Sequence, residues 1–293
     1  MNARLQRLGL LIRTLLGLSG VALGWKLGGW STALCLGLFL GNLRSVSMLS
    51  LFLALAVINR QHRPGAFSLL QAWWCEAWAL ERSFGWRQPF ASQFHADFLP
   101  AATGARGVLL LHGFSCNRGL WNDWMPELRR LGLPHIALTL EPIHGSIDSY
   151  AEAIEQAVVQ LETATGQPPL LLAHSMGGLA SRAWWRKYGR DGRVHGLVTL
   201  GSPHAGTVMA FGAPMLNARQ MRRGSSWLQA LSQDLNQLPS AHCFFSDCDQ
   251  IVCPAETATL PGARNVFLPG RGHLQLVDDP QVRREVLALL REN

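Results

Sequence analysis

Ser175 lies in a sequence context that suits a nucleophile. The segment PPLLLAHSMGGLASRAWWRKYG predicts a buried strand, a sharp turn at Ser175 and a helix. A serine on such a turn exposes its Oγ above the sheet edge, and the crowded turn needs small residues two positions before and after it, here Ala173 and Gly177. The alternative interpretation, an ordinary strand–helix turn that contains a serine, leaves the small residues at both positions unexplained. We therefore expect Ser175 to act as a nucleophile.

A histidine and a carboxylate must accompany such a serine. A serine hydroxyl is a poor nucleophile unless an imidazole accepts its proton, and a carboxylate orients that imidazole. In sites of this strand–turn–helix kind the chain order is serine, acid, histidine. His273, in LPGRGHLQLVDDP, is the only histidine after His242. It is the expected base, and a solvated loop histidine is the alternative.

The expected acid lies on the loop SDCDQIVCP, which follows the penultimate predicted strand. Asp249 is favoured over Asp247 because the apolar residues that follow it can pack the loop and fix the carboxylate. Asp247 is then expected to cap the loop. Asp278 and Asp279 follow the histidine in the chain, and we expect them to cap the last helix together with Pro280.

Two backbone N–H groups are expected to form an oxyanion hole. One belongs to Met176, directly after the serine, and the other to Phe114 in the loop HGFSCNRGLW. His112, at the start of that loop, is expected to brace it rather than to transfer protons.

Short apolar runs alternate with helical patterns from residue 107 onward. Such runs are apolar on both faces, as are the strands of a buried parallel sheet. They are residues 107–112, 134–140, 169–173, 195–200, 241–245 and 264–268. Helical spacing in 148–164, with Asp148 as N-cap, and in 280–291 completes the pattern. The predicted fold class is α/β, a doubly wound, mostly parallel sheet, whose reactive groups collect at the carboxyl ends of the strands.

The excess positive charge belongs to the N-terminal segment. Of the formal net charge of +7, all arises in residues 1–64, which hold seven basic residues and no acid; the rest of the chain is balanced. Because the folded domain carries no basic stripe, we expect no nucleic-acid partner. Basic residues beside apolar runs suit a membrane surface.

Residues 8–58 are apolar almost throughout and too long for a cleaved signal peptide. We expect residues 1–64 to form two membrane spans, about 8–28 and 31–58, with Arg44 inside the second. Two spans and the basic flanks place the C-terminal domain in the cytoplasm, at a bacterial inner membrane. One or three spans would export it, and a hairpin buried against the domain is the remaining alternative.

Residues 65–104 are expected to form an amphipathic linker and a first strand. Within it, SLLQAWWCEAWALERSFG predicts a helix whose tryptophans Trp73, Trp74 and Trp78 suit either a headgroup interface or packing against the domain. The six cysteines form no CxxC pair, so we expect buried free thiols and no metal site, with a Cys248–Cys253 disulfide as the alternative.

From about residue 105 to 291 the chain resembles bacterial lipases and esterases of the α/β-hydrolase family. The resemblance rests on LLLHGF, AHSMGG, VTLGSPHAGT, CDQIV with GARNV, and GRGH. It implies one hydrolase domain, 105–293, with His204 beside the site and a cap or lid at about 205–240. Its apolar side chains would line an acyl pocket or simply pack the insertion: Met209, Phe211, Met215, Leu216 and Trp227. Two departures are the long N-terminal segment and Ala173 in place of the usual glycine.

Together these features predict a membrane-anchored serine hydrolase of carboxylic esters, such as a phospholipid or acylglycerol, that needs no cofactor. An acyltransferase or a thioesterase would use the same triad. A membrane scaffold with a vestigial hydrolase domain is an alternative of another class. Acyl-chain length, headgroup preference and oligomeric state have no signature in the sequence.

Overall fold

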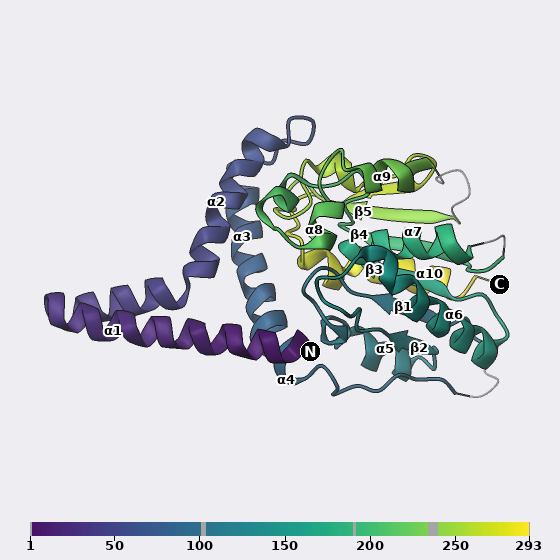
Figure 1. Ribbon diagram of the computed structural model, residues 1–293, viewed down its shortest axis with the longest axis horizontal. Helices are drawn as coiled ribbons and strands as arrows, with labels where there is room; N and C mark the ends of the chain where they lie inside the picture. The colour runs from purple at the N-terminus through teal and green to yellow at the C-terminus, as the bar shows by residue number, and fades with distance from the viewer. Residues whose placement is uncertain (1, 101–103, 190–191, 234–239, 293) are drawn as a thin grey trace.

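The computed structural model describes residues 2–100, 104–189, 192–233 and 240–292. Figure 1 shows an α/β body on which helices of the N-terminal segment are packed, with one helical hairpin that projects away from the body. The active-site candidates lie in the body, and the N-terminal helices lie beside them.

The body is built on six parallel strands in the order β2-β1-β3-β4-β5-β6. Their bounds are β1 Val108–Leu111, β2 His135–Ala137, β3 Leu170–His174, β4 Gly196–Leu200, β5 Ala241–Phe245 and β6 Arg264–Phe267. Each of the six predicted strands is confirmed, and so is the α/β fold class. Along β1, Leu110 belongs to one hydrophobic core and Leu109 to another, because successive side chains point to opposite faces.

Helices cover both faces of this sheet. One core contains residues of α5 (Trp124–Arg130) and α10 (Pro280–Leu289), and the other contains residues of α6 (Ala151–Thr165) and α7 (Met176–Tyr188). The shorter helices in this part of the chain are η2 (Arg118–Trp121), η3 (Ile147–Tyr150), η4 (Val208–Gly212), α8 (Leu216–Gln220), α9 (Ser226–Leu231), η6 (Ala255–Ala258) and η7 (Gln275–Asp278).

The predicted helix cap is present at α10 and absent at α6. Asp279 accepts a hydrogen bond from the N–H of Gln281 and caps α10, as expected. Asp278, which was also expected to cap this helix, instead pairs with Arg82 and Arg283. Asp148, in contrast, does not cap α6. A short 3-10 turn precedes that helix, and the side chain of Ser146 caps the turn. The Asp148 carboxylate instead accepts hydrogen bonds from Arg186 and Trp227.

The N-terminal segment begins with a helical hairpin. Helix α1 (Asn2–Gly41) is interrupted at Gly28 and Gly29, where the chain reverses; Gly29 has φ = +74°, a conformation that favours glycine. The two arms touch at small residues: a Cβ on Gly24 would lie 2.5 Å from the carbonyl oxygen of Thr32. Within the described residues, α1 is the one helix that is long and apolar enough to cross a membrane.

The predicted second span, 31–58, is not one continuous helix. The return arm of α1 ends at Gly41, and α2 (Leu43–Ile58) starts after a break at Asn42. Helix α2 then runs beside α3 (Ala66–Leu80), as Figure 1 shows. Met48, Phe52 and Leu55 of α2 are buried in the core shared with the sheet, so this helix packs on the body instead of leaving it.

Residues 65–104 contain α3, its continuation η1 (Glu81–Arg87) and the short α4 (Gln88–Phe90). In place of a strand, the described part of this segment has a single antiparallel bridge between Phe98 and His135. Trp73 packs inward and donates its Nε1–H to the carbonyl of Ser45, whereas Trp74 and Trp78 are exposed. The predicted amphipathic helix is therefore present, with two of its three tryptophans at the surface.

Candidate active site

Parallel strands bring four loops to one edge of the sheet. Ser175 directly follows β3, Phe114 follows β1, Asp249 follows β5, and His273 follows β6. Because the carboxyl ends of all these strands lie at the same edge, side chains far apart in the sequence converge there.

Ser175 occupies a strained backbone conformation between β3 and α7. Its φ and ψ are 55° and −126°, which is unusual for a residue other than glycine. The turn is tight: a Cβ on Gly177 would lie 2.6 Å from the carbonyl oxygen of Leu111. The backbone N–H of Ser175 donates to Leu200 of β4, so the turn is fixed to the neighbouring strand. This is the geometry of a nucleophile held above a sheet edge.

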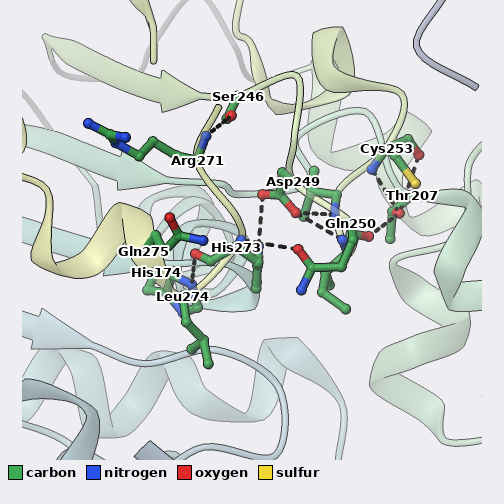
Figure 2. Close-up of polar contacts among 12 residues, drawn as sticks. His174, Thr207, Ser246, Asp249, Gln250, Cys253, Arg271, His273, Leu274 and Gln275 are labelled. Atoms are coloured by element: carbon green, nitrogen blue, oxygen red, sulfur yellow. Dashed lines mark hydrogen bonds and ion pairs between the residues drawn. The ribbon is translucent and has the colours of Figure 1, made fainter. Parts of the chain in front are cut away.

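His273 and Asp249 form a buried pair. The distance between His273 Nδ1 and Asp249 Oδ2 is 2.8 Å, and both side chains are almost fully buried. The other carboxylate oxygen of Asp249 accepts hydrogen bonds from the N–H groups of Ile251 and Val252. Figure 2 shows Asp249 and Gln250 on the same side of His273, each joined to it by a dashed line. The carboxylate is thus held by its own loop through Oδ1 and contacts the imidazole through Oδ2.

The charges around His273 favour its protonated form. Burial lowers the pKa of His273, but the Asp249 carboxylate, through charge and hydrogen bond, and the Glu76 carboxylate raise it, and the net pKa lies above the ordinary value of 6.5. The ring of His174 lies 4.5 Å away, centroid to centroid. Burial and the neighbouring His273 keep the pKa of His174 well below 6.5, so His174 is neutral.

Asp247 does not contact the histidine ring. Its Oδ1 accepts the N–H of Gly270 at 2.7 Å, which ties the end of β5 to the loop that carries His273. The structure therefore brings Asp249 to the imidazole and leaves Asp247 as a cap of the adjoining loops.

The loop after β1 approaches the serine closely. A Cβ on Gly113 would lie 2.7 Å from the Cβ and 3.2 Å from the Oγ of Ser175. His112 braces this loop: its Nε2 accepts the N–H of Leu140, so its Nδ1–H donates to the carbonyl of Gly113 at 2.8 Å. Burial lowers the pKa of His112 to about 4, which keeps the ring neutral. The next residue is Phe114, so its N–H and that of Met176 belong to the two segments that meet at Ser175.

A cavity of about 280 Å³ contains both Ser175 and His273. Part of its wall comes from the N-terminal helices, which sequence reasoning did not connect with the site. These residues are Arg44, Ser47, Met48 and Leu51 of α2, Glu76 and Leu80 of α3, and Phe84 of η1. The guanidinium carbon of Arg44 lies 4.6 Å from the centroid of the Phe84 ring. This cation–π contact stabilises the charge of Arg44 on an otherwise apolar helix.

The apolar residues predicted to line an acyl pocket do not line this cavity. Met209 packs against the hydrophobic core that contains residues of α5 and α10. Phe211 and Leu216 are exposed, and Met215 is half-buried. Trp227 packs against the other core and donates its Nε1–H to Asp148. Within the described part of the insertion, Met209 and Trp227 thus pack on the body, which was the other interpretation of its apolar content.

His204 is buried away from the cavity. Its Nε2 lies 3.0 Å from the hydroxyl oxygen of Thr199, and Arg182 donates to its backbone carbonyl. All six cysteines are free thiols; Cys35 and Cys75 are exposed and the other four are buried.

Glu76 and Gln250 are site residues that the sequence analysis missed. Both are buried, and both contact the loop of His273 through hydrogen bonds. A signal was available: Glu76 is the first acidic residue of the chain, and it shares one face of α3 with the buried Leu69 and Ala72. A carboxylate on the buried face of a helix requires partners, and so it marks a site.

Comparisons with known proteins agree with this architecture. A family model described as the alpha/beta hydrolase family matches residues 108–242. The mature lipase BlEst2 of Bacillus licheniformis is similar in structure, with a TM-score of 0.57 at 14% identity, over 65% of this chain and 94% of that one. A monoacylglycerol lipase of Paleococcus ferrophilus has a TM-score of 0.50 at 16% identity, over 67% and 97%. No curated protein sequence matches.

Proposed function

We propose that this chain, which has the α/β-hydrolase fold and matches that family's model over residues 108–242, is a membrane-attached serine hydrolase that cleaves carboxylic esters of lipids. The observation that carries the proposal is the buried pair of His273 and Asp249, which opens into the same cavity as the strained Ser175. These three residue types, at three strand ends and in this order, are what an acyl-enzyme mechanism requires.

The proposed chemistry begins with proton transfer. Asp249 accepts the Nδ1–H of His273 and so leaves Nε2 as the proton acceptor. Nε2 takes the proton of the Ser175 hydroxyl while Oγ forms a bond to the ester carbonyl carbon. The tetrahedral intermediate collapses, the C–O bond to the alcohol breaks, and His273 returns the proton to the leaving alcohol. Water then attacks the acyl-enzyme by the same route and releases the acid.

The developing oxyanion would accept hydrogen bonds from the backbone N–H groups of Phe114 and Met176. Supporting this, Gly113 brings the first segment within van der Waals contact of Ser175, and Met176 begins the helix that follows the serine. Since both donors are backbone groups, they are already oriented before the substrate binds.

A lipid substrate is favoured by the wall of the cavity. Met48 and Leu51 lie on α2, which follows directly from the apolar hairpin, and Leu80 and Phe84 add further apolar surface. The cavity therefore lies between the sheet edge and helices of the apolar N-terminal segment. An acyl chain leaving a bilayer would meet these residues before it reaches Ser175.

The start of α1 supports a proposal about the sidedness of the protein. The side-chain amide of Asn2 donates to the carbonyl of Cys116, and Arg7 Nε donates to the carbonyl of Pro89 at 2.6 Å. The chain thus enters and leaves the projecting hairpin on the side of the hydrolase body. With seven basic residues and no acid in residues 1–64, we propose that this side is the cytoplasm.

The test uses the full-length protein in detergent with a fluorophosphonate probe and a panel of p-nitrophenyl esters and phospholipids. We expect the probe to label Ser175 and the wild type to turn over esters, while Ser175→Ala should lose both properties. Absence of labelling in folded wild-type protein, or labelling that persists in Ser175→Ala, would refute the proposal and favour a scaffold without catalytic function.

A further inference from the structure

The loop that carries His273 is held by a carboxylate from the N-terminal segment. Glu76 of α3 is 1% exposed. Its Oε1 accepts the backbone N–H of Leu274 at 2.8 Å, and its Oε2 accepts the N–H of Gln275 at 3.2 Å. These are the two residues that directly follow His273, so the carboxylate fixes the backbone next to the imidazole.

Gln250 extends this contact to His273 itself. Its side-chain Nε2 donates to Glu76 Oε1 at 3.0 Å, and its Oε1 accepts the backbone N–H of His273 at 3.2 Å. Gln250 is also the residue directly after Asp249, and Figure 2 shows its side chain joined to His273 by a dashed line. One buried network therefore joins α3, the loop of the acid and the loop of the base.

A second contact from the N-terminal segment holds the loop of the acid. Asn59, at the end of α2, is fully buried; its amide donates to the carbonyl of Asp247, and its Oδ1 accepts the N–H of Ala255 at 2.9 Å. Asp247 and Ala255 flank the stretch that contains Asp249. Both catalytic loops are thus fastened to helices that lie outside the part of the chain resembling lipases.

We propose that Glu76 is a positioning residue: as an ionised carboxylate, it holds the His273 loop in register with Ser175, so that the N-terminal segment completes the active site as well as attaching the protein to the membrane. This inference rests on the proposed serine-hydrolase function. Its physical basis is that every hydrogen bond received by Glu76 comes from an N–H donor, so a carboxylate, which only accepts, matches its surroundings.

The charge of Glu76 has its own consequence for His273. Burial raises the pKa of Glu76, the N–H donors and His273 lower it, and the Asp249 carboxylate raises it, so that the net pKa lies above the ordinary value of 4.5. The groups that face His273 are Asp249 from the β5 loop, Glu76 from α3 and the neutral His174 from β3. Since the charge of Glu76 raises the pKa of His273, removing that charge must move this pKa downward.

The test compares Glu76→Gln, Glu76→Asp and the control Glu81→Gln in full-length protein, by kcat, KM and the pH profile of kcat/KM for a soluble p-nitrophenyl ester. Glu81 lies farther along the same helical segment, pairs with Arg13 and is not among the residues that line the cavity. Glu76→Gln places an NH₂ group against N–H donors, so we expect kcat to fall about 100-fold, the effect of a roughly 1 Å misplacement. KM should change little.

The pH profile separates positioning of the loop from general damage to the fold. In Glu76→Gln the acid limb should move to lower pH, whereas Glu76→Asp, which keeps the charge but shortens the side chain, should lose kcat with the acid limb unmoved. Glu81→Gln should behave as the wild type. Wild-type kcat and an unmoved acid limb in Glu76→Gln would overturn the proposal, as would an equal loss in Glu81→Gln.

A variant on the other side of the network covers the case in which Glu76→Gln does not fold. Gln250→Met retains the side-chain length and removes both hydrogen bonds that link Glu76 to His273. A fall of about tenfold or more in kcat supports the proposal, and wild-type kcat overturns it. An inactive wild type would instead point to failure of the proposed function, because every comparison is made with wild-type turnover.

Discussion

Gly113 and Ser175 are in such close contact that the loop after β1 has no room for a side chain. A methyl group on Gly113 would lie 2.7 Å from the serine Cβ and 3.2 Å from its Oγ, distances at which one of the two segments must shift. In the proposed mechanism, the shift would move the Phe114 N–H away from the position of the oxyanion. The absence of a side chain at position 113 is therefore expected to matter both for packing against Ser175 and for the position of the Phe114 N–H.

We expect Gly113→Ala to reduce kcat by on the order of 10²–10³, the usual effect of a displaced oxyanion donor, while the protein remains folded. Steady-state kinetics and a thermal melt of the purified variant check this. Gly212→Ala is the matched control, because a Cβ there meets nothing within 4 Å. Wild-type kinetics in Gly113→Ala would mean that this loop does not serve the oxyanion.

The two aspartates near the end of β5 should differ sharply in their effect on turnover. Asp249→Asn retains the shape of the side chain but no longer favours the Nδ1–H tautomer of His273, so kcat should fall by on the order of 10⁴. Asp247→Asn keeps an oxygen that can accept the N–H of Gly270, so we expect less than a tenfold change. Kinetics of both variants decide the assignment, which is wrong if Asp247→Asn is as damaging as Asp249→Asn.

The activity should depend on pH through the imidazole of His273. This ring accepts the serine proton only when it is unprotonated, and its pKa lies above 6.5 because of Asp249 and Glu76. The activity is therefore fully present above that pKa and is lost as the pH falls through it. The acid limb of kcat/KM should have its midpoint above pH 6.5, and a midpoint below 6.5 would show that Asp249 does not act on the ring in solution.

The sheet and the candidate site were predictable because their signals are local. A run such as LLLAH followed by Ser175 and a helix contains the strand, the turn and the nucleophile within a few residues. His273 and Asp249 could be selected in the same way, each from a loop that follows a predicted strand. The parallel topology then brings these loops together without any further information.

The wall of the cavity was not predictable from local patterns. An apolar side chain on α2 suits a lipid environment and a protein core equally well, so the sequence does not show which of the two it faces. In the structure, Met48, Phe52 and Leu55 are buried against the body. The two interpretations of the apolar residues in the 205–240 insertion could not be separated for the same reason, since a residue such as Met209 suits an acyl pocket and a core equally well. Only the tertiary arrangement distinguishes these cases.

The exposed face of α3 provides a prediction about access to lipid. Phe67, Leu70, Trp74 and Trp78 follow a helical spacing and are 57% to 79% exposed, while Glu76 on the opposite face is buried under the His273 loop. Tryptophan side chains at a helix surface suit the headgroup region of a bilayer. In the proposed function, α3 would thus both position His273 and lie against the membrane that supplies the substrate.

We expect the double variant Trp74→Gln/Trp78→Gln to hydrolyse a lipid ester presented in vesicles several-fold more slowly, with an unchanged rate on a soluble short-chain ester. The projecting hairpin is untouched, so the variant should still float with the vesicles in a density gradient. Phe211→Gln, which removes an exposed aromatic ring from the body, is the control and should leave both rates unaltered.

Equal loss on both substrates would indicate that the tryptophans stabilise the fold, and equal retention would mean that this face does not meet the lipid. The outcome that supports the membrane assignment is a loss confined to the substrate that must be drawn from a bilayer, because only that reaction depends on how α3 lies at the surface.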